Sequence, residues 1–440
     1  MAKFKRYDSY KSSGIEWLGE IPSHWETLKL KFIGKIFAGL SDKKGNDFSK
    51  EFTNDKKPFI PFTNVCNNLK IDKNQMQYVK INPYETQNKV CEKDIIFLMS
   101  SETLEDIGKC SIYLEKEQLY LNSFCKGFRP NLSRINAEFL NYLLQSKTYR
   151  NYFNLTGRGF TRINIKQEHI SNLCAVLPPK DEQEKITSYL DEKTAKIDAS
   201  ISGKEKFIEL LKEQKQIIIN DAVTKGLNKN AKFKSSGIEW LGQIPSHWKF
   251  EKGKWLFKQI KRPVRQTDEI VTCFRDGQVT LRANRRIDGF TNALKEYGYQ
   301  GIRKGDLVIH NMDAFAGAIG ISDSDGKATP VYSVCIPYNE NIVFSGYYAK
   351  YLRNLAMKDF LLSLAKGIRE RSTDFRFKDF GELEFPLPPK DEQEKIVEYI
   401  ENKISKIDKL LNLEQEYIKS LKEYKASLID SVVTGKVRIV

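Results

Sequence analysis

Arginine side chains gather in segments whose composition suits contact with a polyanion. The first is "GRGFTRIN" (Gly157–Asn164), the second is "LRANRR", which begins at Leu281, and the third is "GIRERSTDFRF" (Gly367–Phe377). An arginine can grip a phosphate or pair with the O6 and N7 atoms of guanine. Eight candidate DNA-contacting residues follow from these segments: Arg158, Arg162, Arg282, Arg285, Arg286, Arg369, Arg371 and Arg376. Ordinary surface charge is the alternative at each of them.

Motifs for catalysis are missing from the sequence. No Gly-Lys pair is followed by Ser or Thr, as a phosphate-binding loop requires. Asn82-Pro83-Tyr84 lacks the second proline of the Asn-Pro-Pro-aromatic clamp that base-flipping methyltransferases use, and "FAGAIG" (Phe315–Gly320) has the wrong glycine spacing for a cofactor loop. The cluster Asp191-Glu192-Lys193 falls in a helical pattern and is interpreted as a solvated helix face. The sequence therefore predicts a chain with no catalytic residues and no cofactor.

The composition narrows the class of protein. Lys and Arg number 72 against 57 Asp and Glu, for a formal net charge of +15. Such an excess favours a nucleic-acid partner, although a solvated basic surface would also produce it. The seven cysteines form no CxxC pair and only four histidines exist, so we expect reduced thiols, no metal site and a cytoplasmic location. No signal peptide and no apolar run of membrane-spanning length is present.

Two peptides occur twice, and they reveal the elements that must position these residues. "SSGIEWLGEIPSHW" (Ser12–Trp25) returns with a single change as "SSGIEWLGQIPSHW" (Ser235–Trp248). "LPPKDEQEKI" occupies Leu177–Ile186 and, unchanged, Leu387–Ile396. These separations are far longer than the periods of solenoids, so they indicate a tandem duplication of whole domains. The tryptophans of the repeat, Trp17, Trp25, Trp240 and Trp248, are predicted to be packing anchors.

A long helix is predicted after each Pro-Pro pair, over about Lys180–Ala222 and Lys390–Val433. In each stretch, apolar residues form two rows with a spacing of seven, offset by four, which is the a/d pattern of a coiled coil. The first stretch carries Leu190, Thr194, Ile197, Ile201, Ile208, Leu211, Ile218 and Ala222, and the second carries Ile400, Ile404, Ile407, Leu411, Ile418, Leu421, Leu428 and Val432. Lys204, Lys215, Glu414 and Lys425 interrupt the rows. The two copies are predicted to pair within one chain, with association of two chains as the alternative.

The segments between the repeats differ from each other. Short apolar runs such as "DIIFLM" (Asp94–Met99) and "GDLVIHN" (Gly305–Asn311) alternate with turn residues, which predicts mixed α/β domains. A helical pattern closes each segment, over about Asn136–Phe153 and Ser345–Ala365. The fold class predicted is therefore α+β, with two such domains separated by two long helices in a pseudo-two-fold repeat.

The chain resembles the specificity subunits of type I restriction–modification enzymes over essentially its whole length. The resemblance rests on the "SSGIEWLGEIPSHW" opening, the "LPPKDEQEKI" entry to each helix and the two-copy layout. Within the variable domains, "KDIIFLMSSETLEDIG" (Lys93–Gly108) and "GDLVIHNMDAFAGAIG" (Gly305–Gly320) are similar to segments of target-recognition domains. Four further candidate DNA contacts follow from these loops: Ser100, Glu102, Asn311 and Asp313.

The resemblance implies a non-catalytic subunit that reads a bipartite site on double-stranded DNA. It implies an antiparallel coiled coil as a spacer, two methyltransferase subunits and motor–nuclease subunits as partners, and no membrane. The expected division is frame segment 1–25, first target-recognition domain 26–176, first helix 177–226, linker and second frame segment 227–248, second target-recognition domain 249–386, and second helix with tail 387–440. A self-sufficient DNA methyltransferase and a bivalent coiled-coil scaffold are the alternative functions.

Overall fold

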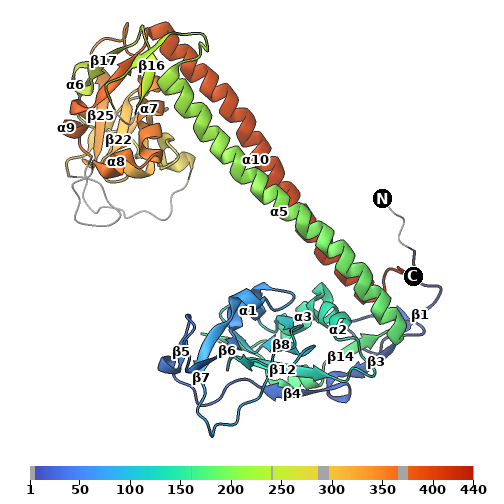
Figure 1. The fold of residues 1–440 in the computed structure, drawn as a ribbon. Helices are drawn as coiled ribbons and strands as arrows, with labels where there is room; N and C mark the ends of the chain where they lie inside the picture. The colour runs from blue at the N-terminus through green and yellow to red at the C-terminus, as the bar shows by residue number, and fades with distance from the viewer. Residues whose placement is uncertain (1–4, 160, 239–240, 286–296, 365–374, 440) are drawn as a thin grey trace. The chain divides into compact units, whose positions relative to one another are not determined.

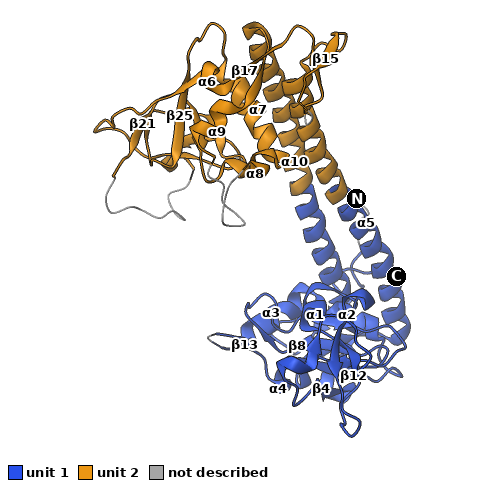
Figure 2. Cartoon of the chain, turned by 60° about the vertical axis from the view of Figure 1, so that its left-hand side comes forward, with its two compact units in different colours: residues 1–204, 416–440 blue, residues 205–415 orange. Residues whose placement is uncertain are grey.

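The protein consists of two compact units, as Figure 2 shows by colour. Unit 1 comprises residues 1–204 and 416–440, and unit 2 comprises residues 205–415. This computed structural model describes all residues except 1–4, 160, 239–240, 286–296, 365–374 and 440. No helix in the described part of the chain is both long and apolar enough to cross a membrane.

Two long helices, α5 (Lys180–Lys225) and α10 (Lys390–Val433), contribute to both units and run side by side (Figure 1). The prediction of a long helix after each Pro-Pro pair is confirmed, and α10 has the predicted bounds. The predicted seam is also confirmed, because its side chains are buried or half-buried along both helices. The lysines that interrupt the seam do not remain unpaired, as the contacts below describe.

Within each unit the two helices are antiparallel. In unit 1, Asp198 of α5 accepts a bond of 2.6 Å from Lys425, and six residues later the Lys204 ammonium lies 4.4 Å from the ring centre of Tyr417. From Asp198 to Lys204 along α5, the contacted residue on α10 changes from Lys425 to the earlier Tyr417, so the two helices run in opposite directions. In unit 2 the same kind of pair joins Lys215 to Asp408 at 2.6 Å. A lysine in the seam therefore reaches a carboxylate on the opposite helix in both units, which ties the two helices to one register.

In unit 1 the globular part of the chain contains two four-stranded sheets. The first is fully antiparallel and has the order β10 (Cys110–Ile112), β8 (Ile95–Leu98), β12 (Cys125–Pro130) and β4 (Gly34–Ala38). The second has the order β11 (Tyr120–Leu121), β6 (Lys56–Ile60), β7 (Gln77–Lys80) and β5 (Phe48–Ser49), with β11 parallel to β6. Helices accompany these sheets: α1 (Phe62–Asn67), α2 (Ala137–Gln145), α3 (Lys147–Thr156) and α4 (Gln167–Ser171).

Unit 2 repeats the first of these sheets and replaces the second. The repeated sheet has the order β23 (Ile319–Ile321), β22 (Leu307–His310), β25 (Tyr332–Pro337) and β18 (Phe257–Gln259). Two antiparallel strand pairs stand in place of the second sheet: β19 (Val271–Cys273) with β20 (Val279–Leu281), and β21 (Gln300–Ile302) with β24 (Gly326–Ala328). The helices are α6 (Gly253–Leu256), α7 (Ser345–Met357), α8 (Phe360–Ser363) and α9 (Phe377–Glu382). Strand β22 therefore has the place in unit 2 that β8 has in unit 1.

Helices form in both segments that the helical patterns predicted, and in each segment they are interrupted. Residue Ser146 is extended (φ −63°, ψ 152°) and separates α2 from α3. The Asp430 carboxylate on α10 accepts from the backbone N–H of Thr148 at 2.8 Å, so a residue distant in sequence caps the second helix. In unit 2, Asp359 has a φ of 58° and separates α7 from α8.

The repeated peptides build the same frame twice. Strand β1 (Tyr10–Ser12) pairs with β2 (Glu20–Pro22), and β15 (Phe233–Ser235) pairs with β16 (Gln243–Pro245) in an identical register. A further strand enters each domain and pairs with the strand that leaves it: β3 (Glu26–Lys29) with β14 (Cys174–Leu177), and β17 (Lys249–Lys252) with β26 (Glu384–Leu387). Each long helix begins directly after the leaving strand, so the frame fixes where the helix starts.

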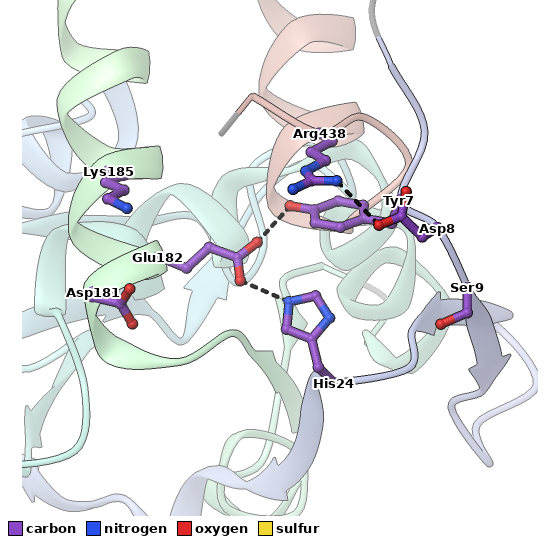
Figure 3. Close-up of a pocket in the computed structure, with 8 residues that line it drawn as sticks. All are labelled: Tyr7, Asp8, Ser9, His24, Asp181, Glu182, Lys185 and Arg438. Atoms are coloured by element: carbon purple, nitrogen blue, oxygen red, sulfur yellow. Dashed lines mark hydrogen bonds and ion pairs between the residues drawn. The ribbon is translucent and has the colours of Figure 1, made fainter.

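One glutamate at the start of each long helix holds the repeated His-Trp pair. Glu182 accepts from Nε2 of His24 at 2.8 Å (Figure 3). It also accepts from Nε1 of Trp25 at 3.3 Å. In unit 2, Glu392 accepts from His247 at 2.9 Å and from Trp248 at 3.1 Å. Both Trp25 and Trp248 have 0% exposed surface, so their predicted packing role is confirmed. Trp240 lies outside the described residues.

The neighbouring glutamine ties each helix to the globular domain. Gln183 donates to the carbonyl of Pro178 and accepts from the backbone N–H of Asn136, both at 2.9 Å. In the same way, Gln393 donates to the carbonyl of Pro388 at 2.9 Å and accepts from the backbone N–H of Phe344 at 2.8 Å. The unchanged Glu-Gln pair of the two repeats is thus explained by contacts that each copy makes within its own unit.

Candidate nucleic-acid interface

The loop that follows β8 brings three of the predicted residues of unit 1 to one cavity. Strand β9 (Ser100–Ser101) pairs with β13 (Ile163–Asn164), and this pairing places Arg162 beside the loop. The cavity has a volume of about 230 Å³, and Ser100, Glu102 and Arg162 all line it. Side chains from two separate segments of the sequence, Ser100 and Glu102 from one and Arg162 from the other, therefore lie in one site.

Arg162 is positioned in this site by a carboxylate and an aromatic ring. Its Nη2 atom lies 3.9 Å from Oε1 of Glu102, and its guanidinium carbon lies 5.1 Å from the ring centre of Phe124. The Arg162 side chain is still 51% exposed and the Glu102 side chain 80%. An exposed guanidinium held in this way can meet a ligand without first losing all of its conformational freedom.

Arg158, the other predicted residue of this loop, has a different environment. Its Nη1 donates to the backbone carbonyls of Leu155 at 2.6 Å and of Gly157 at 2.8 Å. Its backbone pairs with Asn164, so Arg158 lies on the same narrow hairpin as Arg162. Arg158 does not line the cavity that contains Arg162.

A buried arginine that the sequence interpretation missed supports the loop from below. Arg150 of α3 donates through Nη2 to the carbonyls of Glu105 at 3.0 Å and Ile107 at 2.5 Å. Burial lowers the pKa of this guanidinium. Next to it, the Lys109 ammonium holds the pKa of the Asp106 carboxyl below its usual range. The loop that presents Glu102 is therefore anchored by charged bonds at its other end.

In unit 2 the loop after β22 contains the predicted Asn311 and Asp313. Asn311 accepts from the hydroxyl of Ser333 at 2.8 Å. Asp313 accepts from Nη2 of Arg275 at 2.9 Å, and its own backbone N–H donates to Nδ1 of His310 at 3.1 Å. Burial lowers the pKa of His310, which fits its role as a neutral acceptor.

Arg275 was not among the predicted residues. It lies in the turn between β19 and β20, and its side chain is 67% exposed. The sequence signal for the turn is the Asp-Gly pair at Asp276 and Gly277, which is typical of tight hairpins. Arg353 of α7 supports this turn through bonds to the carbonyls of Gly317 at 2.8 Å and Arg275 at 3.4 Å, and burial lowers the pKa of Arg353.

The remaining predicted arginines of unit 2 have separate positions. Arg285 pairs with Asp276 at 2.7 Å and lies 4.2 Å from the ring centre of Phe274. Arg282 donates to the hydroxyl of Thr272 at 3.4 Å, and Arg376 precedes α9. The other three predicted residues, Arg286, Arg369 and Arg371, lie outside the described residues.

The described side chains of the loops after β8 and β22 do not form a metal-binding cluster. Among the residues that the structure describes, no group of three or more His, Cys, Asp and Glu side chains could hold a metal ion. The carboxylates of both loops, Glu102 and Asp313, are instead paired with arginines. This arrangement of neutral and basic hydrogen-bond donors is suited to recognition of nucleic acid.

Comparison with known proteins identifies the family. Residues 22–210 match the model of the type I restriction modification DNA specificity domain. The chain is 25% identical to the putative type I restriction enzyme MjaX specificity subunit of Methanocaldococcus jannaschii, over 100% of this chain and 99% of that protein. It is 22% identical to the StySPI specificity subunit of Salmonella potsdam, over 87% of this chain and 82% of that protein. Residues 22–210 therefore carry this specificity domain, and the chain as a whole is similar to the specificity subunits of type I restriction–modification systems.

Solved structures of such subunits have the same fold. The HsdS subunit from Thermoanaerobacter tengcongensis superposes with a TM-score of 0.52 at 16% identity, over 95% of this chain and 98% of that one. A chain from a structure of complex assembly in a type I restriction–modification system superposes with a TM-score of 0.69 at 15% identity, over 94% and 98%. The predicted fold class, α+β with two mixed α/β domains and two long helices packed together, is confirmed. This specificity subunit is non-catalytic and confers DNA target recognition, as the sequence predicts.

Proposed function

We propose that this specificity subunit reads a bipartite site on double-stranded DNA, one half with residues 26–176 and the other with residues 249–386. The proposal rests on one observation: the frame that the repeated peptides build is the same in both units, but the loops after β8 and β22 differ. The central sheet and the His-Trp-Glu contacts occur twice, whereas the loops after β8 and β22 present different side chains. Two readers on equal frames would recognise two unlike half-sites.

The duplicated frame also supports a proposal about partners. Identical peptides with identical internal contacts offer the same surface twice, and such a surface suits two copies of one partner. In this proposal two methyltransferase subunits bind the frame, and motor–nuclease subunits join the assembly. The complex acts in the cytoplasm, where the chain's unpaired thiols stay reduced.

An exchange of one reader tests the proposed function. Residues 249–386 of this chain would be replaced by the corresponding segment of another specificity subunit, and the product combined with its methyltransferase subunit. Mapping of methylated positions before and after the exchange should show one half of the site unchanged and the other replaced. A site in which both halves change would contradict separate readers.

A further inference from the structure

The two reading loops share a feature that lies outside the repeated peptides. In each unit, a carboxylate follows the equivalent central strand and holds an exposed arginine. Glu102 follows β8 and faces Arg162 at 3.9 Å, whereas Asp313 follows β22 and bonds Arg275 at 2.9 Å. The arginines come from different places in the two domains, since Arg162 precedes β13 and Arg275 lies in the turn after β19. The same kind of carboxylate–arginine pair is therefore formed from different structural elements in the two units.

We propose that Arg162 and Arg275 each read a guanine, one in each half-site, and that Glu102 and Asp313 position them. This inference rests on the proposed function. A guanidinium has five N–H donors. When one of them faces the carboxylate, two of the others remain available to donate to the O6 and N7 atoms of guanine. The two arginines are 51% and 67% exposed, which leaves room for a base edge.

The carboxylate distinguishes a base-reading arginine from a phosphate-binding one. A phosphate that approached Arg162 or Arg275 would be repelled by Glu102 or Asp313, because both carry negative charge. The edge of a guanine is neutral and meets no such repulsion. Arg158 provides the contrast, since its bonds run to backbone carbonyls and it has the environment expected of a phosphate contact.

Arg285 is also paired with a carboxylate, but its geometry differs. Its guanidinium lies over Phe274, a ring with only 9% exposed surface, and its own side chain is 38% exposed. Asp276, its partner, belongs to the same β19–β20 hairpin. Arg285 therefore stabilises that hairpin and serves as a control for loss of an arginine that does not read a base.

Substitution by lysine tests the assignment, because lysine keeps the charge and loses the two-pronged donor. The complete complex of this subunit with its methyltransferase subunit would methylate a library of sites with randomised bases, and sequencing would report the preferred bases. Arg162→Lys should reduce discrimination about 5- to 150-fold at one G·C pair of the first half-site and nowhere else. Arg275→Lys should do the same at one G·C pair of the second half-site.

The control variants separate the possible outcomes. Arg158→Lys and Arg285→Lys should leave the preferred bases unchanged. Glu102→Gln should weaken discrimination at the same pair as Arg162→Lys and should have no added effect in an Arg162→Lys background. If Glu102→Gln alters a different base pair, the carboxylate reads DNA itself and its positioning role is wrong.

Failure of the inference differs from failure of the proposed function. If the unsubstituted complex has no bipartite preference in the library, the proposed function is wrong. If that preference is present and Arg162→Lys and Arg275→Lys leave it unchanged, the guanine assignment is overturned. Loss of discrimination at an A·T pair would overturn it as well.

Discussion

Replacement of Tyr7 by phenylalanine should destabilise unit 1 and leave unit 2 unaffected. The hydroxyl of Tyr7 donates to Oε1 of Glu182 at 2.6 Å and is buried, as Figure 3 shows. Burial also raises the pKa of Tyr7, so the hydroxyl stays a donor at every working pH. The repeat position in the second frame is Asn230, an exposed residue, and Glu392 accepts only from His247 and Trp248 among the described contacts of its side chain.

The size of the effect follows from this one bond. Tyr7→Phe keeps the ring, so it opens no cavity and removes a single hydrogen bond to a charged acceptor. Such a bond contributes about 1.5–3 kcal/mol to stability. In a domain of the size of unit 1, 1 kcal/mol corresponds to about 2–4 °C in the melting temperature, so we expect a decrease of about 3–12 °C.

Calorimetry of the full chain would measure the decrease, and hydrogen exchange would locate it. Protection should fall in the first frame hairpin, β1–β2, and remain unchanged in the second, β15–β16. Asn230→Ala is the matched control and should change neither. In a double-mutant cycle with Glu182→Gln, the two substitutions should be strongly non-additive. A melting temperature within 1 °C of the unsubstituted chain, on the order of the effect of a neutral surface change, would refute the reasoning.

Two further predictions concern the contacts that support the reading loops. Asp430→Asn should lower stability at pH 7 by about 1–2 kcal/mol, because a charged acceptor is lost. Burial raises the pKa of the Asp430 carboxyl, but Lys436 and the Thr148 amide outweigh burial and hold the pKa below its usual 3.8. The stabilisation is therefore present above about pH 4 and lost as the pH falls through the lower folded value, so thermal melts of the two chains should converge in acid. Gly277→Ala should perturb the β19–β20 turn, because Gly277 has a φ of 88° and a Cβ there would lie 1.9 Å from Nη1 of Arg353. We expect a loss of about 1–3 kcal/mol and weaker discrimination in the second half-site only, measured by melting and by site-library methylation.

Local signals in the sequence were sufficient for the long helices and the seam. Pro-Pro pairs and a spacing of seven act within one stretch of chain, and they predict the start of α5 and α10 correctly. The break at Ser146 could not be found in this way. The apolar pattern runs on through Ser146, and the bond that caps the following helix comes from Asp430 on α10. A tertiary contact therefore decides a boundary that periodicity leaves open.

The candidate site was predicted in part for a similar reason. Ser100 and Glu102 belong to one predicted segment and Arg162 to another, and the β9–β13 pairing brings them together. Arg275 was overlooked because its turn has a hairpin signal but no cluster of basic residues. Its relation to Asp313 depends on the way two distant turns meet, and no local pattern contains that information.

The contacts of the repeated peptides explain which residues the duplication keeps. His24, Trp25, Glu182 and Gln183 bond to one another or to the backbone of their own unit, so a change in one of them would leave a buried polar partner unsatisfied. The loops that carry Glu102 and Arg162 are held by a separate set of contacts, such as those of Arg150. A change in a reading loop therefore need not disturb the frame. Physical separation of the two sets of contacts is what allows one chain to carry two equal frames with two different readers.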